Sequence, residues 1–380
     1  MSGSTGRRFS RSETTVTQQG GHPTLRFGIV GCGHIATKHA QALEVIEGAK
    51  LEAVCDTVPE RTQPYVDRYG CRAYDDLEKM LADPQIDVVC ICTPSGLHAQ
   101  MGVAAAYAKK HVVVEKPLTL SLKDADAMIA AAEGNGVLLA VVHPNRFLPG
   151  VVALRQQVEQ GAFGTFTHAA AVVRWNRNQA YYDSAPWRGT AAMDGGFFLN
   201  QAIHNIDLLQ WMMGPVEEVF AYTTTRLRKI ETEDLGVAVL RFQNGALGTI
   251  EGAATLYPQN LEESLALFGE TGSAKLGGRT IGTIESWHFA RLNDEEAQRW
   301  VQQVNQNPKG TRTGHQAILS DMVQAVLEHR PPVVNGREAR KALEIVLAIY
   351  QSAREHRPVR LPLTAQPASR VPSLHESGSF

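Results

Sequence analysis

The chain has 380 residues, of which 43% are hydrophobic and 20% are charged, and its formal net charge is −2. This length is enough for two domains of ordinary size, and this charge gives no electrostatic reason to expect nucleic acid or an anionic membrane as a partner. No apolar run approaches the roughly 20 residues that a membrane-spanning helix needs.

The two ends of the chain differ in composition from the middle. Residues 1–24 are rich in Ser, Thr, Gly and Gln and lack an apolar core, so they predict a disordered leader and not a signal peptide. Residues 364–380 predict a flexible tail.

All five cysteines precede residue 93, and none is in a C-x-x-C pair. We expect buried, reduced thiols, a cytoplasmic protein and no bound metal.

A glycine-rich turn follows the first apolar segment, Leu25–Val30. Gly31, Gly33 and Ala36 fit the G-x-G-x-x-A fingerprint of dinucleotide-binding proteins. Gly31 permits the tight turn, Gly33 lets a pyrophosphate approach the backbone, and Ala36 allows close packing of the helix on its strand. The N–H groups at the start of that helix would face the phosphates.

A second apolar segment, residues 50–55, ends in an acidic residue. Asp56 lies twenty residues after Ala36, where a carboxylate accepts hydrogen bonds from the adenosine ribose of NAD and repels the extra phosphate of NADP. The alternative is that Asp56 only caps the helix that begins near Pro59. Together with the turn, the pattern predicts dinucleotide binding, with NAD favoured over NADP.

Strands and helices alternate through the first part of the chain, which predicts a parallel sheet with right-handed crossovers. Further strands are expected at 87–92, 111–115 and 137–142, and helices near 34–45, 60–69, 76–82, 97–109 and 121–133. In open parallel sheets, ligands bind beyond the carboxyl ends of the strands. Lys116 ends a strand there and precedes Pro117, so we expect its side chain at the rim of a crevice, although it fits a surface lysine too.

After a helix near 149–160, the pattern changes to segments of period two. They are Phe163–Arg174, Val219–Arg228, Gly236–Phe242, Ala246–Ala254, Ser264–Phe268 and Ser273–Leu276, with expected turns at 243–245 and 270–272. Such a series predicts a mostly antiparallel sheet, hence an α+β second domain. Two helices near 314–329 and 337–356 close the chain, separated by Asn335-Gly336.

The segment Asp194–Pro215 is a further candidate for function. It begins with Gly195-Gly196, and an apolar stripe indicates a helix. Asn200, His204 and Asp207 recur at helical spacing on another face, so Asn200 and His204 could project into one cleft. A structural role for a single helical histidine is the alternative.

The motifs GIVGCGHIA, CTPSGLH, EKP and GG-x-x-x-N-x-x-x-H-x-x-D occur in one order over residues 25–363. In this combination the chain resembles the glucose–fructose oxidoreductase / inositol dehydrogenase / MocA family. The resemblance implies an α/β Rossmann domain at 25–147 and an α+β domain with an open-faced sheet at 148–363. It also implies NAD-dependent oxidation of a sugar or cyclitol hydroxyl, and a homotetramer or dimer formed through that sheet.

The resemblance implies roles for individual residues. Lys116 and His204 match the catalytic pair, and Asn200 falls where many members have Asp, which argues against inositol dehydrogenase proper. The implied substrate residues are Lys116, His143, Arg174, Asn200 and His204. The implied cofactor residues are Gly31, Gly33, His34, Ile35, Asp56, Thr93, Ser95, His98, Glu115, Lys116, Trp187 and Arg188.

Within the family, the segments RWNRNQAYYDSAPWRG, LNQAIHNIDLLQW and YPQNLEESLALFGETGSAKLGG are similar to bacterial dehydrogenases that oxidise C3 of UDP-N-acetylglucosaminuronate in the synthesis of surface polysaccharide sugars. The alternatives are a dehydrogenase of a free sugar or cyclitol, a regulator that binds the dinucleotide without turnover, and an enzyme that recycles NAD in place with a second substrate. The sequence leaves open which of Lys116 and His204 is the base.

Overall fold

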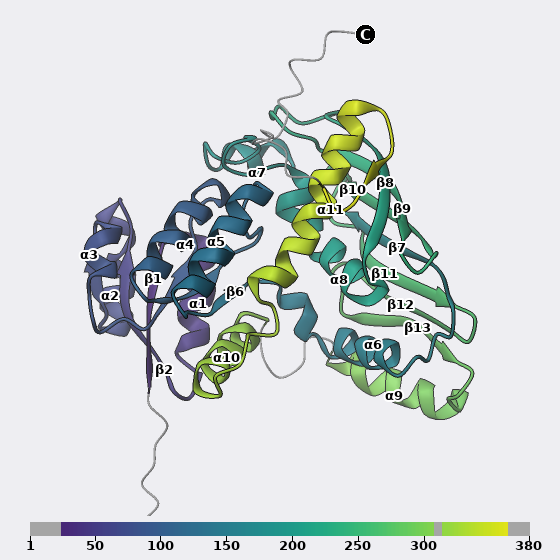
Figure 1. Ribbon diagram of the computed structural model, residues 1–380, viewed down its shortest axis with the longest axis horizontal. Coiled ribbons are helices and arrows are strands. Elements are labelled where there is room, and N and C mark those ends of the chain that lie inside the picture. Colours follow the sequence, from purple (N-terminus) through teal and green to yellow (C-terminus); the bar gives the residue numbers. More distant parts are fainter. Residues whose placement is uncertain (1–23, 308–313, 364–380) are drawn as a thin grey trace, which may run out of the picture.

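A computed structural model describes residues 24–307 and 314–363, so the predictions for the leader and the tail fall almost wholly outside the described residues. The described chain forms two sheets with helices around and between them (Figure 1). No helix in the described ranges is long and apolar enough to cross a membrane.

The first sheet has six parallel strands in the order β3-β2-β1-β4-β5-β6, as the alternating pattern predicts. Its strands are β1 (Leu25–Val30), β2 (Ala49–Cys55), β3 (Arg72–Tyr74), β4 (Val88–Ile91), β5 (His111–Val114) and β6 (Leu139–Val141). The helices between them are α1 (His34–Leu43), α2 (Gln63–Tyr69), α3 (Leu77–Leu81), α4 (His98–Tyr107) and α5 (Leu122–Gly134), with short 3-10 turns η1 (Pro59–Arg61), η2 (Ser95–Leu97) and η3 (Pro144–Phe147).

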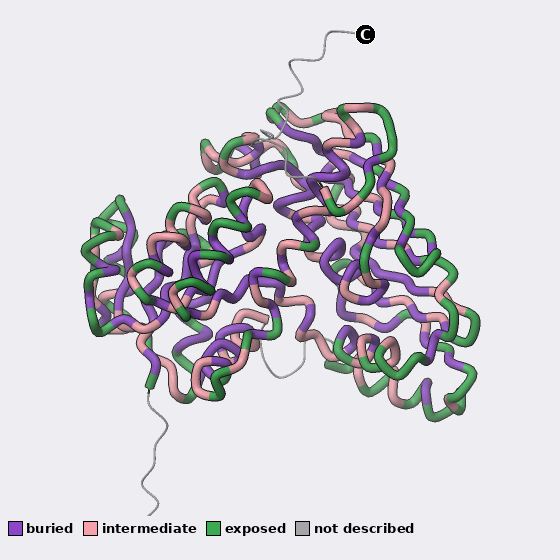
Figure 2. The backbone as a smooth tube through the Cα atoms, in the orientation of Figure 1, coloured by how far each residue is buried: buried purple, intermediate pink, exposed green. Residues whose placement is uncertain are grey.

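The central strands of this sheet are buried on both faces. β4 has no exposed residue, and Val112, Val113 and Val114 of β5 are 0% exposed. Figure 2 shows these strands in the buried colour beneath helices that are exposed on their outer sides. A continuous apolar run is therefore the expected sequence of a strand covered by helices on both sides.

The second sheet has eight strands in the order β13-β12-β11-β7-β10-β9-β8-β14. They are β7 (Phe166–Arg174), β8 (Val216–Thr224), β9 (Leu235–Phe242), β10 (Leu247–Ala253), β11 (Glu262–Gly269), β12 (Gly272–Gly277), β13 (Thr283–Phe289) and β14 (Val359–Arg360). All neighbours are antiparallel except β7 and β10. The predicted turns at 243–245 and 270–272 join β9 to β10 and β11 to β12.

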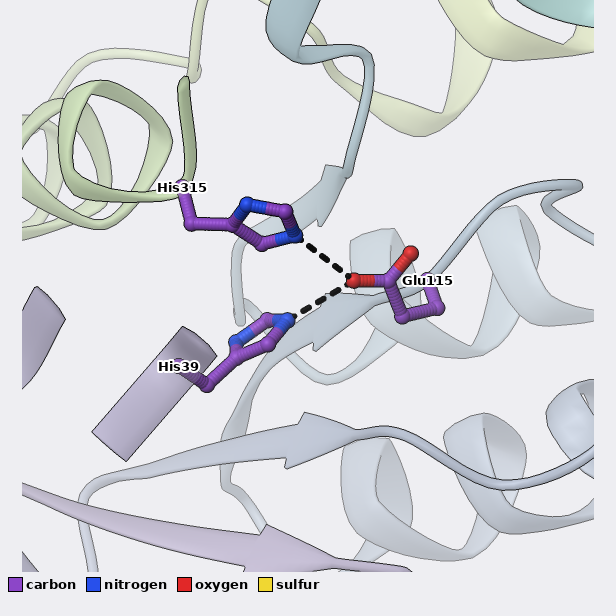
Figure 3. Close-up of side chains that lie close together, drawn as sticks. All are labelled: His39, Glu115 and His315. Atoms are coloured by element: carbon purple, nitrogen blue, oxygen red, sulfur yellow. Dashed lines mark hydrogen bonds and ion pairs between the residues drawn. The ribbon is translucent and has the colours of Figure 1, made fainter. Parts of the chain in front are cut away.

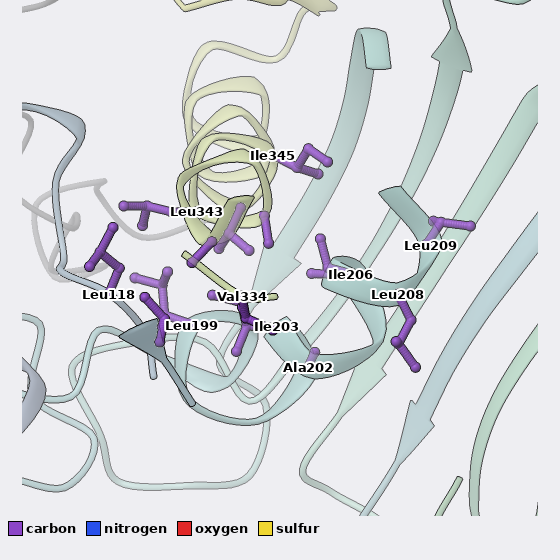
Figure 4. Packing of buried hydrophobic residues seen from close by; sticks show 14 of the residues in the cluster. Leu118, Leu199, Ala202, Ile203, Ile206, Leu208, Leu209, Val334, Leu343 and Ile345 are labelled. Atoms are coloured by element: carbon purple, nitrogen blue, oxygen red, sulfur yellow. The ribbon is translucent and has the colours of Figure 1, made fainter. Parts of the chain in front are cut away.

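Helices cover one face of this sheet and leave the other face open. The helices of the second half are α6 (Pro149–Glu159), α7 (Gln179–Asp183), the π-helical turn η4 (Phe198–Ala202), α8 (Ile203–Met213), α9 (Asp294–Gln306), α10 (Gly314–Leu327) and α11 (Gly336–Glu355). α8 packs against β7 and β11, and α11 packs on both α8 and β8. Figure 4 shows the leucine and isoleucine side chains between α8 and α11.

The end of the chain returns to the first domain. Ile318, Leu319, Met322 and Val323 of α10 belong to the same buried cluster as α1 and β1, and α11 contacts α5 and β6 as well as the second sheet. Asn335 begins α11, since its side chain accepts a hydrogen bond from the backbone N–H of Glu338. α10 therefore packs into the core of the first domain, although it follows residue 148 in the chain.

Candidate active site

The glycine-rich turn leaves an open cradle at the end of β1. Gly31 has φ +85°, and a Cβ there would lie 2.9 Å from Cγ2 of Thr93, so only glycine fits. A Cβ added at Gly33 would meet no atom within 4 Å. This space lies where α1 begins at His34 and Ile35, with the N–H groups of its first turn nearby. The residues fit the pyrophosphate of a dinucleotide.

Asp56 closes one side of this cradle. Its carboxylate accepts hydrogen bonds from the backbone N–H of Cys32, at 2.8 Å, and of Val58, at 2.9 Å. Asp56 is therefore bonded to the glycine-rich turn itself, and it caps no helix. Arg61 lies 3.7 Å from the same carboxylate, and 60% of its side chain is exposed.

We expect Asp56→Asn to relax the choice between NAD and NADP. The amide oxygen can still accept a hydrogen bond from Cys32, but the negative charge that repels a 2′-phosphate is lost and Arg61 is released to bind it. Like charges placed together cost several kcal/mol, so the ratio of kcat/KM for NADP over NAD should rise about tenfold or more in steady-state assays. An unchanged ratio would remove Asp56 from cofactor selection, and Asp67→Asn on exposed α2 serves as the control.

The loop that follows β4 lies beside the cradle. Thr93 contacts the Gly31 turn and Ser95 is buried. His98 is 1% exposed, and its two ring nitrogens lie 2.8 Å from the Pro117 carbonyl and 3.0 Å from the Thr93 carbonyl. His98 lies between these two loops, and because both neighbouring groups are carbonyl acceptors, a neutral imidazole donates a hydrogen bond to only one of them. The expected contact of His98 with the cofactor stays a prediction.

Glu115 is held by two histidines from different helices (Figure 3). Its Oε1 lies 2.8 Å from Nε2 of His39 in α1 and 3.3 Å from Nε2 of His315 in α10. Burial raises the pKa of Glu115, but the bonds and charges of the two imidazoles outweigh burial and bring it well below its usual value. Glu115 therefore stays ionised beneath Lys116 and joins α10 to the first domain.

Lys116 crosses from the first domain to the second. Its Nζ donates a hydrogen bond to the backbone carbonyl of Asn200 at 2.6 Å, and the Lys116–Pro117 peptide bond is cis. Burial lowers the pKa of Lys116, while the charges of Glu115 and Asp194 counteract part of this effect. The amine is thus placed one helical turn before His204, and its burial makes it easier to deprotonate than a lysine in water.

Asn200 is bonded to a carboxylate that the sequence patterns did not single out. Its Nδ2 donates to Oδ1 of Asp194, whose Oδ2 accepts the backbone N–H of Gly189 at 2.7 Å. Oδ1 of Asn200 accepts a hydrogen bond from Gln201 at 2.6 Å. Burial raises the pKa of Asp194. Residue 200 is an asparagine and carries no charge. Asp194 nevertheless supplies a carboxylate within electrostatic range of Lys116.

His204 faces a second histidine. The rings of His204 and His143 meet edge to face with centroids 5.7 Å apart, and His143 is 1% exposed. Nδ1 of His204 is buried without a hydrogen-bond partner in the described part of the chain. Burial, the charge of Lys116 and the neighbouring His143 bring the pKa of His204 well below its usual value. His204 is therefore a neutral imidazole, able to accept a proton or a hydrogen bond.

Asp207 anchors the helix that carries His204. It forms a two-pronged ion pair with Arg146, with distances of 2.7 Å and 2.6 Å, and both side chains are 1% exposed. Its Oδ2 also lies 3.8 Å from Nδ1 of His143. Asp207 is therefore buried in the core, and His143 lies between it and His204.

Arg174 lies apart from Lys116 and His204, and its role as a substrate residue stays a prediction. It is the last residue of β7, and it pairs with Glu251 of β10 and Glu262 of β11. Its neighbour Val173 is buried against the helices, so Arg174 points to the opposite, open face of the sheet. The strand register decides this placement. Trp187 and Arg188 do lie near the site, with the guanidinium 4.6 Å from the Trp187 ring.

Comparison with known proteins identifies the family to which the chain belongs. Residues 25–143 match the Gfo/Idh/MocA oxidoreductase family model for an NAD-binding Rossmann fold, and residues 151–275 match the family's C-terminal domain. The chain is 31% identical to myo-inositol 2-dehydrogenase of Thermotoga maritima, over 89% of this chain and 98% of that protein.

Two solved structures are similar over most of the molecule. The WlbA dehydrogenase from Bordetella pertussis, in complex with NADH and UDP-GlcNAcA, is 39% identical with a TM-score of 0.86, over 90% of this chain and 99% of that chain. The WlbA dehydrogenase from Chromobacterium violaceum, with the same ligands, is 37% identical with a TM-score of 0.85, over 90% of this chain and 98% of that chain. The chain therefore belongs to the Gfo/Idh/MocA family and is an NAD-dependent oxidoreductase.

Proposed function

We propose that this enzyme oxidises the C3 hydroxyl of a UDP-N-acetyl-amino sugar, with UDP-N-acetylglucosaminuronate as its substrate, in the synthesis of surface polysaccharide sugars. The observation that carries the proposal is the bond between Lys116 and the carbonyl of Asn200, which brings an amine of the first domain to the helical segment of His204. Similarity to two dehydrogenases crystallised with UDP-GlcNAcA supports this substrate class.

The proposed mechanism uses the two groups as an acid–base pair. The sugar hydroxyl lies between Lys116 and His204, one of which removes its proton while the other donates a hydrogen bond to the oxygen as negative charge develops. Asn200, held by Asp194, orients the hydroxyl or the imidazole. Gly31, Gly33 and Asp56 would hold NAD, which would supply the acceptor for the hydride that leaves C3.

A binding experiment tests the substrate class. In the presence of NADH, UDP-N-acetylglucosaminuronate at about 100 times its Kd should stabilise the fold by about 2.7 kcal/mol, seen as a higher Tm. Inositol and glucose should leave Tm unchanged. A rise with inositol and none with the UDP-sugar would contradict the proposal and favour a cyclitol dehydrogenase, which the 31% identity to myo-inositol 2-dehydrogenase makes the second candidate.

We also propose that the enzyme forms a dimer or tetramer through the open face of the second sheet. This face carries the exposed apolar side chains of Tyr222, Val237, Val239 and Leu247, of which Val239 is 53% exposed at the centre of β9. Such patches on a sheet are typical of contacts between chains. Val239→Asp should shift the mass measured by light scattering to a smaller species. A wild-type monomer, or an unchanged mass in the variant, would contradict this interface.

A further inference from the structure

Two half-buried arginines beside the site form no ion pair with an acidic residue in the described part of the chain. Arg177 donates to the Asn176 carbonyl at 2.9 Å and to Oε1 of Gln201 at 3.1 Å, and Arg188 donates to the hydroxyl of Tyr181 at 2.5 Å. Within residues 24–307 and 314–363, neither forms an ion pair, and Nε of each is buried without a partner.

The contrast with other arginines of this chain is informative. Arg146 is buried against Asp207, and Arg174 on the open sheet face is paired with Glu251. A charge removed from water without a counter-charge is costly. Arg188 acts electrostatically on Asp194 and Arg177 on Glu263, but neither carboxylate forms an ion pair with these half-buried arginines in the described part of the chain. The two guanidinium groups can therefore still pair with an anion that a ligand brings.

Aromatic rings fix the two groups and leave N–H edges available. The Arg177 guanidinium lies 4.6 Å from the Trp175 ring and 5.2 Å from the Tyr181 ring, and that of Arg188 lies 4.3 Å from the Tyr181 ring. Stacking of this kind holds a guanidinium in one orientation, because the flat group lies against the ring. The two guanidinium groups of Arg177 and Arg188, called the fork below, are thus held in place before a ligand binds.

The two arginines are connected to the catalytic segment. Gln201, which accepts the hydrogen bond from Arg177, donates to Tyr181 at 3.1 Å and to Oδ1 of Asn200 at 2.6 Å. The carbonyl of Asn200 binds Lys116. Both arginine charges act on Lys116, whose pKa they lower. Arg177 and Arg188 are therefore joined to the residues around Lys116 by a continuous series of hydrogen bonds.

We infer that Arg177 and Arg188 form an oxyanion subsite that binds a carboxylate carried by the sugar ring undergoing oxidation. This inference rests on the proposed function and makes the enzyme specific for a uronate over the corresponding neutral sugar. Guanidinium groups match the planar, two-oxygen geometry of a carboxylate. The carboxylate also neutralises positive charge around Lys116 and His204, so its binding and the proton transfer are electrostatically coupled.

The test compares UDP-N-acetylglucosaminuronate with UDP-N-acetylglucosamine, which differ only at C6. The wild type should show the higher kcat/KM with the uronate. Arg177→Gln should lower kcat/KM for the uronate by about 30-fold or more, the lower end for truncating one partner of a buried charge pair, and change the neutral sugar only a few-fold. Arg177→Lys keeps the charge and should keep part of the preference, and Arg299→Gln on exposed α9 is the control.

The inference would be overturned if Arg177→Gln lowered kcat/KM equally for the two UDP-sugars, or if the wild type had the same kcat/KM for both. Binding in the presence of NADH separates it from the proposed function. If glucuronate but no UDP-sugar raises Tm, and Arg177→Gln abolishes that rise, the subsite stands while the nucleotide-sugar function fails. If UDP alone binds in a manner that depends on Arg177, the diphosphate occupies the fork and the carboxylate assignment is wrong.

Discussion

Lys116→Ala is expected to lower kcat with UDP-N-acetylglucosaminuronate by about a hundredfold to ten-thousandfold, the range that general acid–base groups typically contribute. The Lys116 amine donates a hydrogen bond to the Asn200 carbonyl of the second domain, so the variant loses this bond, worth about 1 kcal/mol. The binding of NADH, measured by its fluorescence, should remain nearly intact because the glycine-rich cradle does not include the Lys116 amine.

Lys123→Ala on exposed α5 is the matched control, and it should leave kcat unchanged. If Lys116→Ala turns over as fast as the wild type, then Lys116 takes no part in proton transfer and His204 must act with another group. A loss of NADH binding as large as the loss of kcat would instead place Lys116 in the cofactor site.

Asp207→Ala is expected to destabilise the fold by about 3–5 kcal/mol, the usual cost of leaving one charge of a buried pair without its partner. Arg146 and Asp207 are both 1% exposed, and Glu338, at 3.3 Å from Arg146, replaces only part of the lost interaction. Urea unfolding at pH 7 measures the effect. Glu133→Ala, which breaks an exposed pair with Arg337, should leave stability close to unchanged.

A double variant, Arg146→Met with Asp207→Leu, separates charge from packing. Because both charges are removed together, it should recover much of the stability lost in Asp207→Ala. If Asp207→Ala is as stable as the wild type, the buried pair does not anchor α8, and the position of His204 must be held by the apolar contacts of the helix alone.

Local patterns in the sequence predict most of the first domain correctly. Gly31 has the positive φ that its place in the fingerprint implies. Asp56, at the end of the next strand, accepts a hydrogen bond from Cys32 in the glycine-rich turn. The valine run of β5 predicts its burial. These features depend on residues close together in the chain, where backbone sterics and strand burial act directly.

Short or polar elements escape such patterns. β3 and β14 have three and two residues, too few for a recognisable period, and β13 with α9 lies in a stretch without an Asn-Gly turn or an apolar run. α10 shows its helical pattern clearly, but nothing in its own residues says that it packs on α1 of the first domain. The partner of an apolar stripe is decided by the whole fold.

The sequence alone predicted the alternation of strands and helices in the first domain and the dinucleotide cradle, because these follow from local sterics and from the spacing of residues close together in the chain. The pairing of Lys116 with His204 as candidate chemistry came from the resemblance to a known family. The tertiary structure decided which side chains meet. It turned Arg174 to the open sheet face and Asp207 into the core, and it brought Asp194 to Asn200. Strand register and helix packing set such contacts, and both depend on residues far apart in the chain.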